Sequence, residues 1–145
     1  MEKKYIRQWG IDVIVKRSLD LDMIEKGVEL WLMRWFCRIR FETTNGWTKE
    51  HLAIIDTGSP LCVVPQEIWK DCKITIIADT EMYFGFSKDR EGIPVRLGEV
   101  HPVIINESGY INGENVNAYL ALTSDIPLIL GLDLIDHLLR IDMKR

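Results

Sequence analysis

The sequence has few cysteines and no long uninterrupted apolar run. Its three cysteines are an odd number without Cys-x-x-Cys spacing, which argues against both a disulfide framework and a zinc knuckle. We expect Cys37, Cys62 and Cys72 to be reduced thiols, buried or half-buried. The longest apolar stretch, residues 126–135, contains a proline, a glycine and an aspartate and is shorter than the roughly 18–20 residues that cross a membrane. We therefore expect no membrane partner.

An excess of positive charge is also missing. The chain has 18 Lys and Arg residues against 22 Asp and Glu, which gives a formal net charge of -4. Such a chain has no overall basic field for the phosphate contacts that dominate nucleic-acid affinity, so no nucleic-acid partner is expected. The N-terminal residues have neither the apolar centre nor the small-residue cleavage site of a signal peptide, and this predicts a cytoplasmic protein.

Metal-ligand patterns are absent as well. The three histidines, His51, His101 and His137, are far apart and show no spacing such as His-Glu-x-x-His. The sequence therefore predicts neither a metal site nor a cofactor.

What remains is the composition of one ordinary globular domain. With 145 residues, 47% of them hydrophobic and 28% charged, the chain is long enough for a single core and short for two. Residues 1–29 show the least regular pattern, and we interpret them as an N-terminal extension that packs on the domain or on a dimer interface. Residues 30–145 are expected to form the domain itself.

A long strand is the clearest element at the start of this domain. Between residues 31 and 41 apolar side chains fall on every second position and arginines fall between them, as in a half-buried strand. Asn45-Gly46 is a hairpin turn signal, and residues 51–55 supply the returning strand. We expect Trp31 and Trp35 in the core or in a dimer interface.

Many short strands follow. Turn residues separate β-prone runs at residues 61–64, 73–77, 81–86, 93–97, 102–105, 116–122 and 127–130. A brief helix is expected at residues 65–69 with Pro65 at its first position, and a terminal helix after Gly131. The pattern predicts an all-β domain, a closed barrel or a folded sandwich.

The strongest chemical signal is Asp56-Thr57-Gly58-Ser59, which directly follows the apolar run at residues 52–55. This order places a carboxylate at the lip of a core, where water is partly excluded. On its own the motif is weak, because Asp and Gly are common turn residues.

Two further segments change the interpretation. The chain returns to apolar residues at 61–65, and much later an apolar run with a glycine, Leu128 to Ile135, leads into the predicted terminal helix. Together with Asp56-Thr57-Gly58-Ser59, these segments resemble the retropepsin-like aspartic proteases over about residues 33–143. The run Leu130 to Ile135 is most similar to the protease domain of DNA-damage-inducible ubiquitin shuttle proteins. The resemblance implies an all-β closed barrel with a flap hairpin and one short C-terminal helix.

The chemistry of peptide hydrolysis agrees with this resemblance. Amides and water are both unreactive, so a general base must activate the water while a general acid protonates the carbonyl oxygen. Two carboxylates held close together share one proton and can fill both roles. The sequence contains one Asp-Thr-Gly, so the second carboxylate would come from another copy, in a homodimer with catalytic Asp56 facing its equivalent across a two-fold axis.

The resemblance implies roles for the neighbouring residues. Thr57 would bond across the dimer axis, Gly58 would let the backbone pass close to the partner carboxylate, and Ser59 would bond the outer oxygen of Asp56. Beneath this loop would pack Ile129, Leu130 and Gly131. The alternatives are an ordinary turn with locally bonded hydroxyls and a plain buried strand end.

The expected flap covers residues 83–94. Tyr83, Phe84, Gly85 and Phe86 would line the substrate cleft, although aromatic residues in a strand also serve cross-strand packing. The flap tip is more charged and longer than the glycine-rich retroviral tip, and Pro60 after the motif would stiffen the loop.

The sequence therefore predicts an aspartic endopeptidase acting on polypeptides as a homodimer. The alternative is a catalytically silent retropepsin-like module that binds peptides or mediates dimerisation. A third hypothesis is a protease monomer whose dimerisation is regulated.

Overall fold

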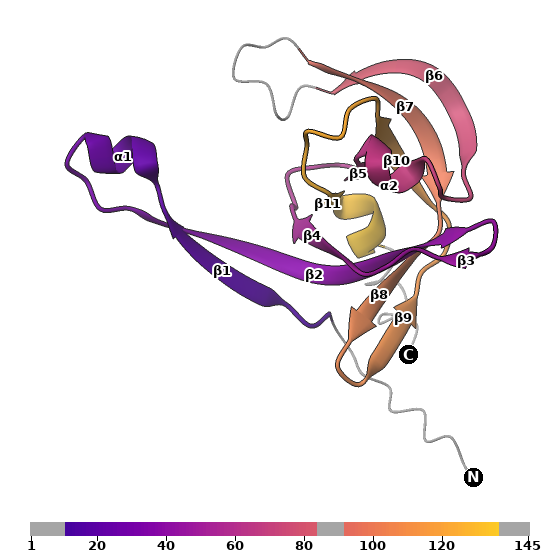
Figure 1. Cartoon of the computed structure of the whole chain (residues 1–145), viewed down its shortest axis with the longest axis horizontal. Helices are drawn as coiled ribbons and strands as arrows, with labels where there is room; N and C mark the ends of the chain where they lie inside the picture. The colour runs from indigo at the N-terminus through magenta and orange to yellow at the C-terminus, as the bar shows by residue number, and fades with distance from the viewer. Residues whose placement is uncertain (1–10, 84–91, 137–145) are drawn as a thin grey trace.

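The computed structural model describes residues 11–83 and 92–136, and in this part the chain forms a mainly β domain (Figure 1). Eleven strands belong to one sheet. In chain order they are β1 (Ile14–Leu19), β2 (Trp31–Thr43), β3 (Gly46–Trp47), β4 (His51–Ile55), β5 (Cys62–Val64), β6 (Thr75–Tyr83), β7 (Ile93–Val100), β8 (Pro102–Asn106), β9 (Gly109–Asn112), β10 (Val116–Ala121) and β11 (Ile129–Leu130). The helices are α1 (Leu21–Glu25), α2 (Gln66–Trp69) and a helical turn at residues 132–136.

The sheet curls into a half-barrel around the core. Its path is β6-β7-β10-β5-β11-β4-β2-β8-β9, and β1 and β3 pair with β2 outside this path. The predicted all-β class is confirmed. The predicted closure is not shown, because within the described residues no pairing joins the end strands β6 and β9.

The core lies on the concave side of the sheet. Cys37, Ile39 and Phe41 of β2 are each at most 1% exposed, as expected from the alternation of that strand. They pack with buried side chains of β5, β10 and β11 and with Leu134 after Gly131. All three cysteines are free and buried, which confirms the expectation of reduced interior thiols.

Several elements differ from the sequence prediction. Residues 73–77 and 81–86 were expected as two strands, but β6 is one strand whose register against β7 shifts twice, at β-bulges or similar irregularities. The strand β9 was not predicted, because Gly109–Asn112 has too few β-prone residues to give a signal. Pro65 is the N-cap of α2 rather than its first residue. The predicted segments beyond residue 136 lie outside the described residues.

The first half of β2 extends beyond the core. It pairs only with β1, and α1 lies between these two strands at the far end (Figure 1). Trp31 and Trp35 are 55% and 53% exposed, so within one chain they are not in the core, contrary to one of the two locations predicted. We call β1, α1 and residues 31–35 of β2 the arm.

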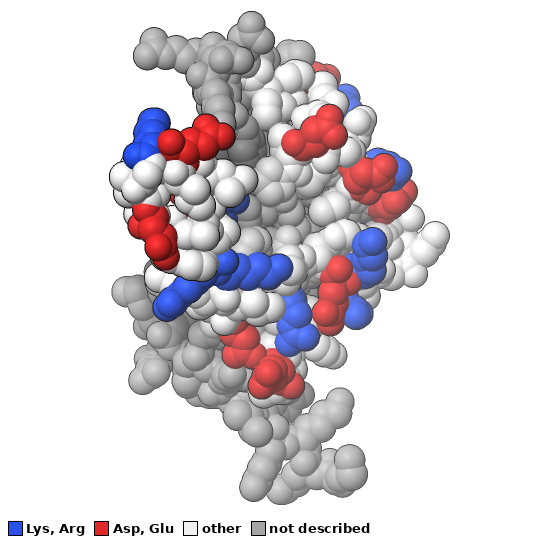
Figure 2. Space-filling model, turned by 60° about the vertical axis from the view of Figure 1, so that its left-hand side comes forward, with Lys and Arg blue, Asp and Glu red and all other residues white. Residues whose placement is uncertain are grey.

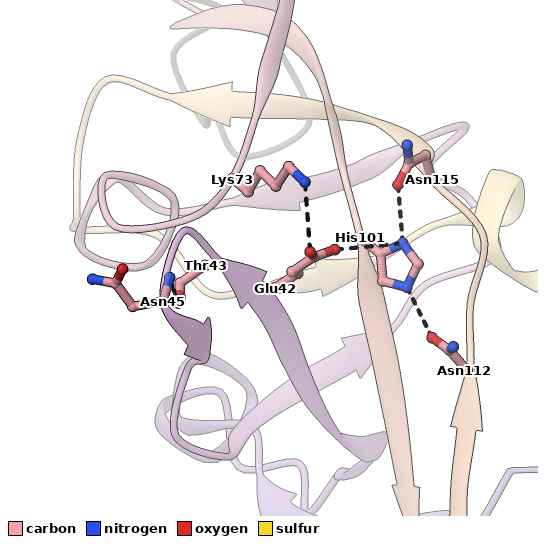
Figure 3. A network of polar contacts seen from close by, with 7 residues as sticks. All are labelled: Glu42, Thr43, Asn45, Lys73, His101, Asn112 and Asn115. Carbon is pink, nitrogen blue, oxygen red and sulfur yellow. Dashed lines mark hydrogen bonds and ion pairs between the residues drawn. The ribbon is translucent and has the colours of Figure 1, made fainter.

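A polar network surrounds His101, between β7 and β8 (Figure 3). Its Nδ1 lies 3.0 Å from Oδ1 of Asn115 and its Nε2 lies 2.8 Å from Oδ1 of Asn112. Glu42 of β2 is 4.0 Å from the same ring and 3.7 Å from Nζ of Lys73. The network therefore links β2 to the segments that enter β6, β8 and β10.

In the part of the chain described, no helix is long and apolar enough to cross a membrane.

Candidate active site

Asp56 stands at the end of β4, where three strands meet. The short strand β11 pairs in parallel with β4 and antiparallel with β5, so it lies between them. The N–H of Ile54 donates to the carbonyl of Leu128 at 2.9 Å, and the N–H of Asp56 donates to that of Leu130 at 3.0 Å. The loop from Asp56 to Leu61 therefore leaves β4, crosses the end of β11 and returns as β5.

The loop itself is held by short-range hydrogen bonds. The N–H of Gly58 donates to Oδ1 of Asp56 at 2.8 Å, and the N–H of Ser59 donates to the carbonyl of Asp56 at 3.2 Å. The hydroxyl of Ser59, which is 1% exposed, donates to the carbonyl of Leu61 at 2.7 Å. These bonds fix one carboxylate oxygen of Asp56. That Ser59 bonds the outer oxygen, and that Thr57 bonds across an axis, stay predictions.

Gly131 lies directly under this loop. A Cβ on this residue would lie 2.8 Å from the carbonyl oxygen of Ser59 and would also overlap the carbonyl of Leu61. Only glycine fits such a close approach of two backbones. The next two residues donate to the loop as well, Leu132 to the carbonyl of Ser59 at 2.8 Å and Asp133 to that of Pro60 at 3.0 Å. The start of the terminal helix thus supports the loop that carries Asp56.

A groove of about 780 Å³ opens beside Asp56. The carboxyl group is half-buried, whereas Thr57 and Gly58 are exposed. Among the described residues of the lining, Asp56 is the one acidic residue and Arg34 the one basic residue. The lining consists of Met33, Arg34, Trp35, Ile54, Ile55, Asp56, Pro127 and Ile129. The described part of one chain therefore presents a single carboxylate in a largely apolar groove.

Sequence reasoning missed the contribution of β2 to this groove. It follows from the observed pairing of the two strands: β2 pairs with β4 through Phe36↔Ile54 and Cys37↔Ala53. Continuing this antiparallel register by two residues sets Arg34 level with Asp56. The turn at residues 44–45 sets the pairs Thr43↔Gly46 and Glu42↔Trp47, and the register then moves by one residue between β3 and β4.

Two further predicted site residues lie in β11 and one lies at the end of β6. Ile129 and Leu130 form β11 and are 4% and 1% exposed. Tyr83 ends β6 and pairs with Ile93 of β7, so the two legs of a hairpin are present at the predicted flap. The remaining flap residues, Phe84, Gly85 and Phe86, lie outside the described residues.

No cysteine lines the described part of the groove, and Cys37 and Cys62 are buried beside it. Burial raises the pKa of the Cys62 thiol, at the start of β5, to about 11, and burial raises that of Cys37 to about 12. Both thiols are neutral at physiological pH and are poor nucleophiles. No group of histidine, cysteine and acidic residues in the described segments could hold a metal ion. Among the described residues that line the groove, the group able to act as a general acid or base is the Asp56 carboxylate.

Comparison with known proteins gives a limited result. No protein-family model and no curated protein sequence matches the chain. The crystal structure of a retropepsin-like aspartic protease from Rickettsia conorii is similar over 89% of this chain and 83% of that one, with a TM-score of 0.43 and 11% identity. The interpretation of the groove therefore depends on its own geometry.

Proposed function

We propose that this protein is an aspartic endopeptidase that works as a homodimer, with Asp56 of each copy forming the catalytic pair. The observation that carries the proposal is the position of Asp56. Its carboxyl group stands at the end of a buried strand, accepts a hydrogen bond from Gly58, and opens into a groove lined by apolar residues. A general acid or base needs such a fixed geometry at a site that substrate can reach.

The second copy supplies the second carboxylate. With two Asp56 side chains sharing one proton, the ionised one takes a proton from water as the water oxygen attacks the carbonyl carbon of the substrate. The protonated one gives its proton to the carbonyl oxygen. Transfer of a proton to the amide nitrogen then breaks the C–N bond and releases an acid and an amine. The exposure of Thr57 and Gly58 leaves this side of the loop open to a partner.

The substrate class follows from the groove. Its walls near Asp56 are the side chains of Ile54, Ile55 and Ile129, and these suit apolar side chains on either side of the cleaved bond. An extended polypeptide segment would bind as an added strand below the β6–β7 hairpin. The narrower resemblance to the ubiquitin shuttle proteases remains part of this proposal.

A second candidate is a peptide-binding or dimerisation module without turnover. One observation favours it: the described residues of a single chain place one carboxylate in the groove, and hydrolysis by this mechanism needs two. A protein that never brings two copies of Asp56 together would bind peptide and leave it intact.

Replacement of Asp56 by Asn separates these candidates. The amide keeps the size of the side chain but can no longer exchange the proton. Wild-type protein should cleave a mixed peptide library at mildly acid pH, a pepstatin-type inhibitor should block the cleavage, and Asp56→Asn should abolish it. Asp125→Asn, at an exposed aspartate outside the groove, is the matched control and should retain full activity. Equal activity in the Asp56 variant would overturn the proposal, and peptide binding without cleavage by wild type would favour the second candidate.

A further inference from the structure

Arg34 is the charged residue of the described groove lining that the proposed mechanism leaves unused. It lines the groove together with Asp56. The pairing Phe36↔Ile54, continued by two residues, sets it level with Asp56 on the neighbouring strand. Neighbouring strands are about 4.8 Å apart, so the guanidinium group can reach an extended peptide within a few residues of the bond that lies over Asp56.

The side chain of Arg34 has no partner in the described part of the chain. It is exposed, and it forms no ion pair or hydrogen bond there, with Asp56 or with any other residue. The next two arginines on the same face of β2 differ in this respect, because Arg38 and Arg40 lie 3.8 Å and 3.7 Å from the carboxylate oxygens of Glu50. The strand thus pairs the arginines far from the groove and leaves the one in the groove open to a ligand.

A second cation lies opposite Arg34. Lys16 of β1 pairs directly with Arg34, so both side chains project from the same face. The Nζ atom of Lys16 is 5.0 Å from the centroid of the Phe36 ring, and among the described residues it forms no ion pair. Like charges directly opposite each other destabilise a strand pair. An acidic ligand would supply the counter-charge that this pair of cations needs.

The charge pattern of the surface agrees with such a ligand. Figure 2, which turns the side of the arm forward, shows Lys and Arg side chains in a row across the middle of the molecule, with Asp and Glu side chains above and below it. A guanidinium group binds a carboxylate through two parallel hydrogen bonds. In a groove for extended polypeptides, the carboxylate that meets Arg34 is the side chain of a glutamate or aspartate.

We infer that Arg34, with Lys16 beside it, is a specificity-determining residue that selects polypeptides with an acidic side chain within about three residues of the cleaved bond. The inference rests on the proposed function, from which it takes the cleaved bond and the second copy. The two-fold axis repeats Arg34 in the other half of the site. The preference therefore applies at equal distances on both sides of the bond, and peptides with an acid on each side are the best substrates.

Cleavage of matched peptide pools tests this selection. The pools are C-terminally amidated decapeptides with Leu or Phe at the two central positions, one other position fixed as Glu, Gln or Lys, and mixed residues elsewhere. At the selected positions wild type should cleave the Glu pool with a kcat/KM about fivefold or more above the Gln pool, and the Lys pool most slowly. In about 0.5 M salt this ratio should fall toward one, because exposed charges are screened. A Gln pool with a free C-terminus should gain nothing, and a gain equal to that of Glu would overturn the selection of side chains.

Substitution of Arg34 assigns the preference to this residue. Arg34→Met should bring the Glu-to-Gln ratio near one, Arg34→Glu should favour the Lys pool, and Arg34→Lys should keep a reduced preference for Glu. Arg17→Met is the matched control, because Arg17 follows Lys16 on β1 but projects from the opposite face and lies outside the groove lining. It should keep the wild-type ratio. Because each ratio is measured within one variant, a general loss of activity does not imitate the result. A wild-type ratio in Arg34→Met would overturn the inference.

Binding separates this inference from the proposed function. Fluorescence anisotropy of labelled Glu and Gln pools is measured on Asp56→Asn protein, where turnover is not needed. Tighter binding of the Glu pool that is lost in the double variant with Arg34→Met supports acid recognition, even if wild type cleaves nothing and the proposed function fails. Cleavage of the Glu, Gln and Lys pools at equal rates leaves the proposed function standing and overturns this inference. Equal binding of both pools, or none, without any cleavage overturns both.

Discussion

The backbone N–H of Asp56 donates to the carbonyl oxygen of Leu130 at 3.0 Å. This hydrogen bond joins the end of β4 to the end of β11. It therefore brings together the Asp56-Thr57-Gly58-Ser59 motif and the apolar run that ends at Gly131. Gly131 follows Leu130 and lies under the loop, so the position of the Asp56 carboxyl group depends on a backbone contact far away in sequence. The next prediction tests that dependence.

Gly131→Ala should both destabilise the protein and displace the Asp56 loop. The added methyl group would overlap the carbonyl groups of Ser59 and Leu61, and both belong to backbone that has little freedom to move. Forced overpacking of this kind costs about 1–3 kcal/mol of unfolding free energy. Urea denaturation measures the loss, and peptide cleavage should fall with it. Leu132→Ala, at the neighbouring residue whose side chain is 45% exposed, should leave both quantities nearly unchanged.

Local sequence signals predicted the elements around Asp56 well. Alternation identified β2, Asn45-Gly46 identified the hairpin, and the apolar runs before Asp56 and before Gly131 identified β4 and β11. These signals work because a half-buried strand needs a period of two and a tight turn needs glycine. The Asp-Thr-Gly motif then identified the loop, because the order of these three residue types can be recognised without knowledge of distant contacts.

The features that the sequence did not predict depend on packing between distant segments. Alternation continues unchanged from Cys37 back to Trp31, so nothing local shows that the core ends between these residues. The position of Arg34 in the groove could not be counted from the turn, because the register of β2 shifts by one residue between β3 and β4. The strand β9 forms because β8 offers a free edge to Gly109–Asn112, and its two β-prone residues, Tyr110 and Ile111, are too short a run to be identified as a strand from the sequence.

Mixing experiments should show that the active site is shared between copies. Adding an excess of Asp56→Asn protein to wild type should suppress peptide cleavage, because subunit exchange places most wild-type chains in dimers with one carboxylate. Asp125→Asn added in the same excess is the control and should raise the rate in proportion to the total protein, since Asp125 is exposed, lies outside the groove and leaves every dimer with two Asp56 carboxylates. Activity that depends only on the amount of wild type present would exclude a site built from two chains.

Trp69→Phe should loosen the contact between α2 and β10. The indole Nε1 of Trp69 donates to the carbonyl of Ala121 at 2.7 Å, in a position where the side chain is 8% exposed. Phenylalanine keeps most of the packing but leaves that carbonyl without its donor, which should cost about 1–3 kcal/mol of stability. Thermal unfolding measures the difference. Trp47→Phe, in an exposed strand, should melt within error of wild type.

The three thiols should be unreactive in the folded protein. Burial raises the pKa of Cys62 and of Cys72 to about 11 and that of Cys37 to about 12, so almost no thiolate is present near neutral pH. A thiol reagent should modify native protein on the order of a hundredfold more slowly than urea-unfolded protein. Cys72, 8% exposed, should react before Cys37, which is 0% exposed. Rapid modification of Cys37 under native conditions would contradict its burial.

His51 should make the fold less stable as the solution becomes mildly acid. Burial in β4, with a smaller effect from Lys49, lowers the pKa of this imidazole below its ordinary value of 6.5. The unfolded chain therefore binds a proton more readily than the folded one just below that pH, and stability falls as pH decreases from about 7 to about 5. His51→Gln removes the titrating ring, so its melting temperature should fall less over the same range. NMR titration of the ring protons gives the direct check: an imidazole of His51 that titrates at or above 6.5 in the folded protein would show that burial does not disfavour its charge.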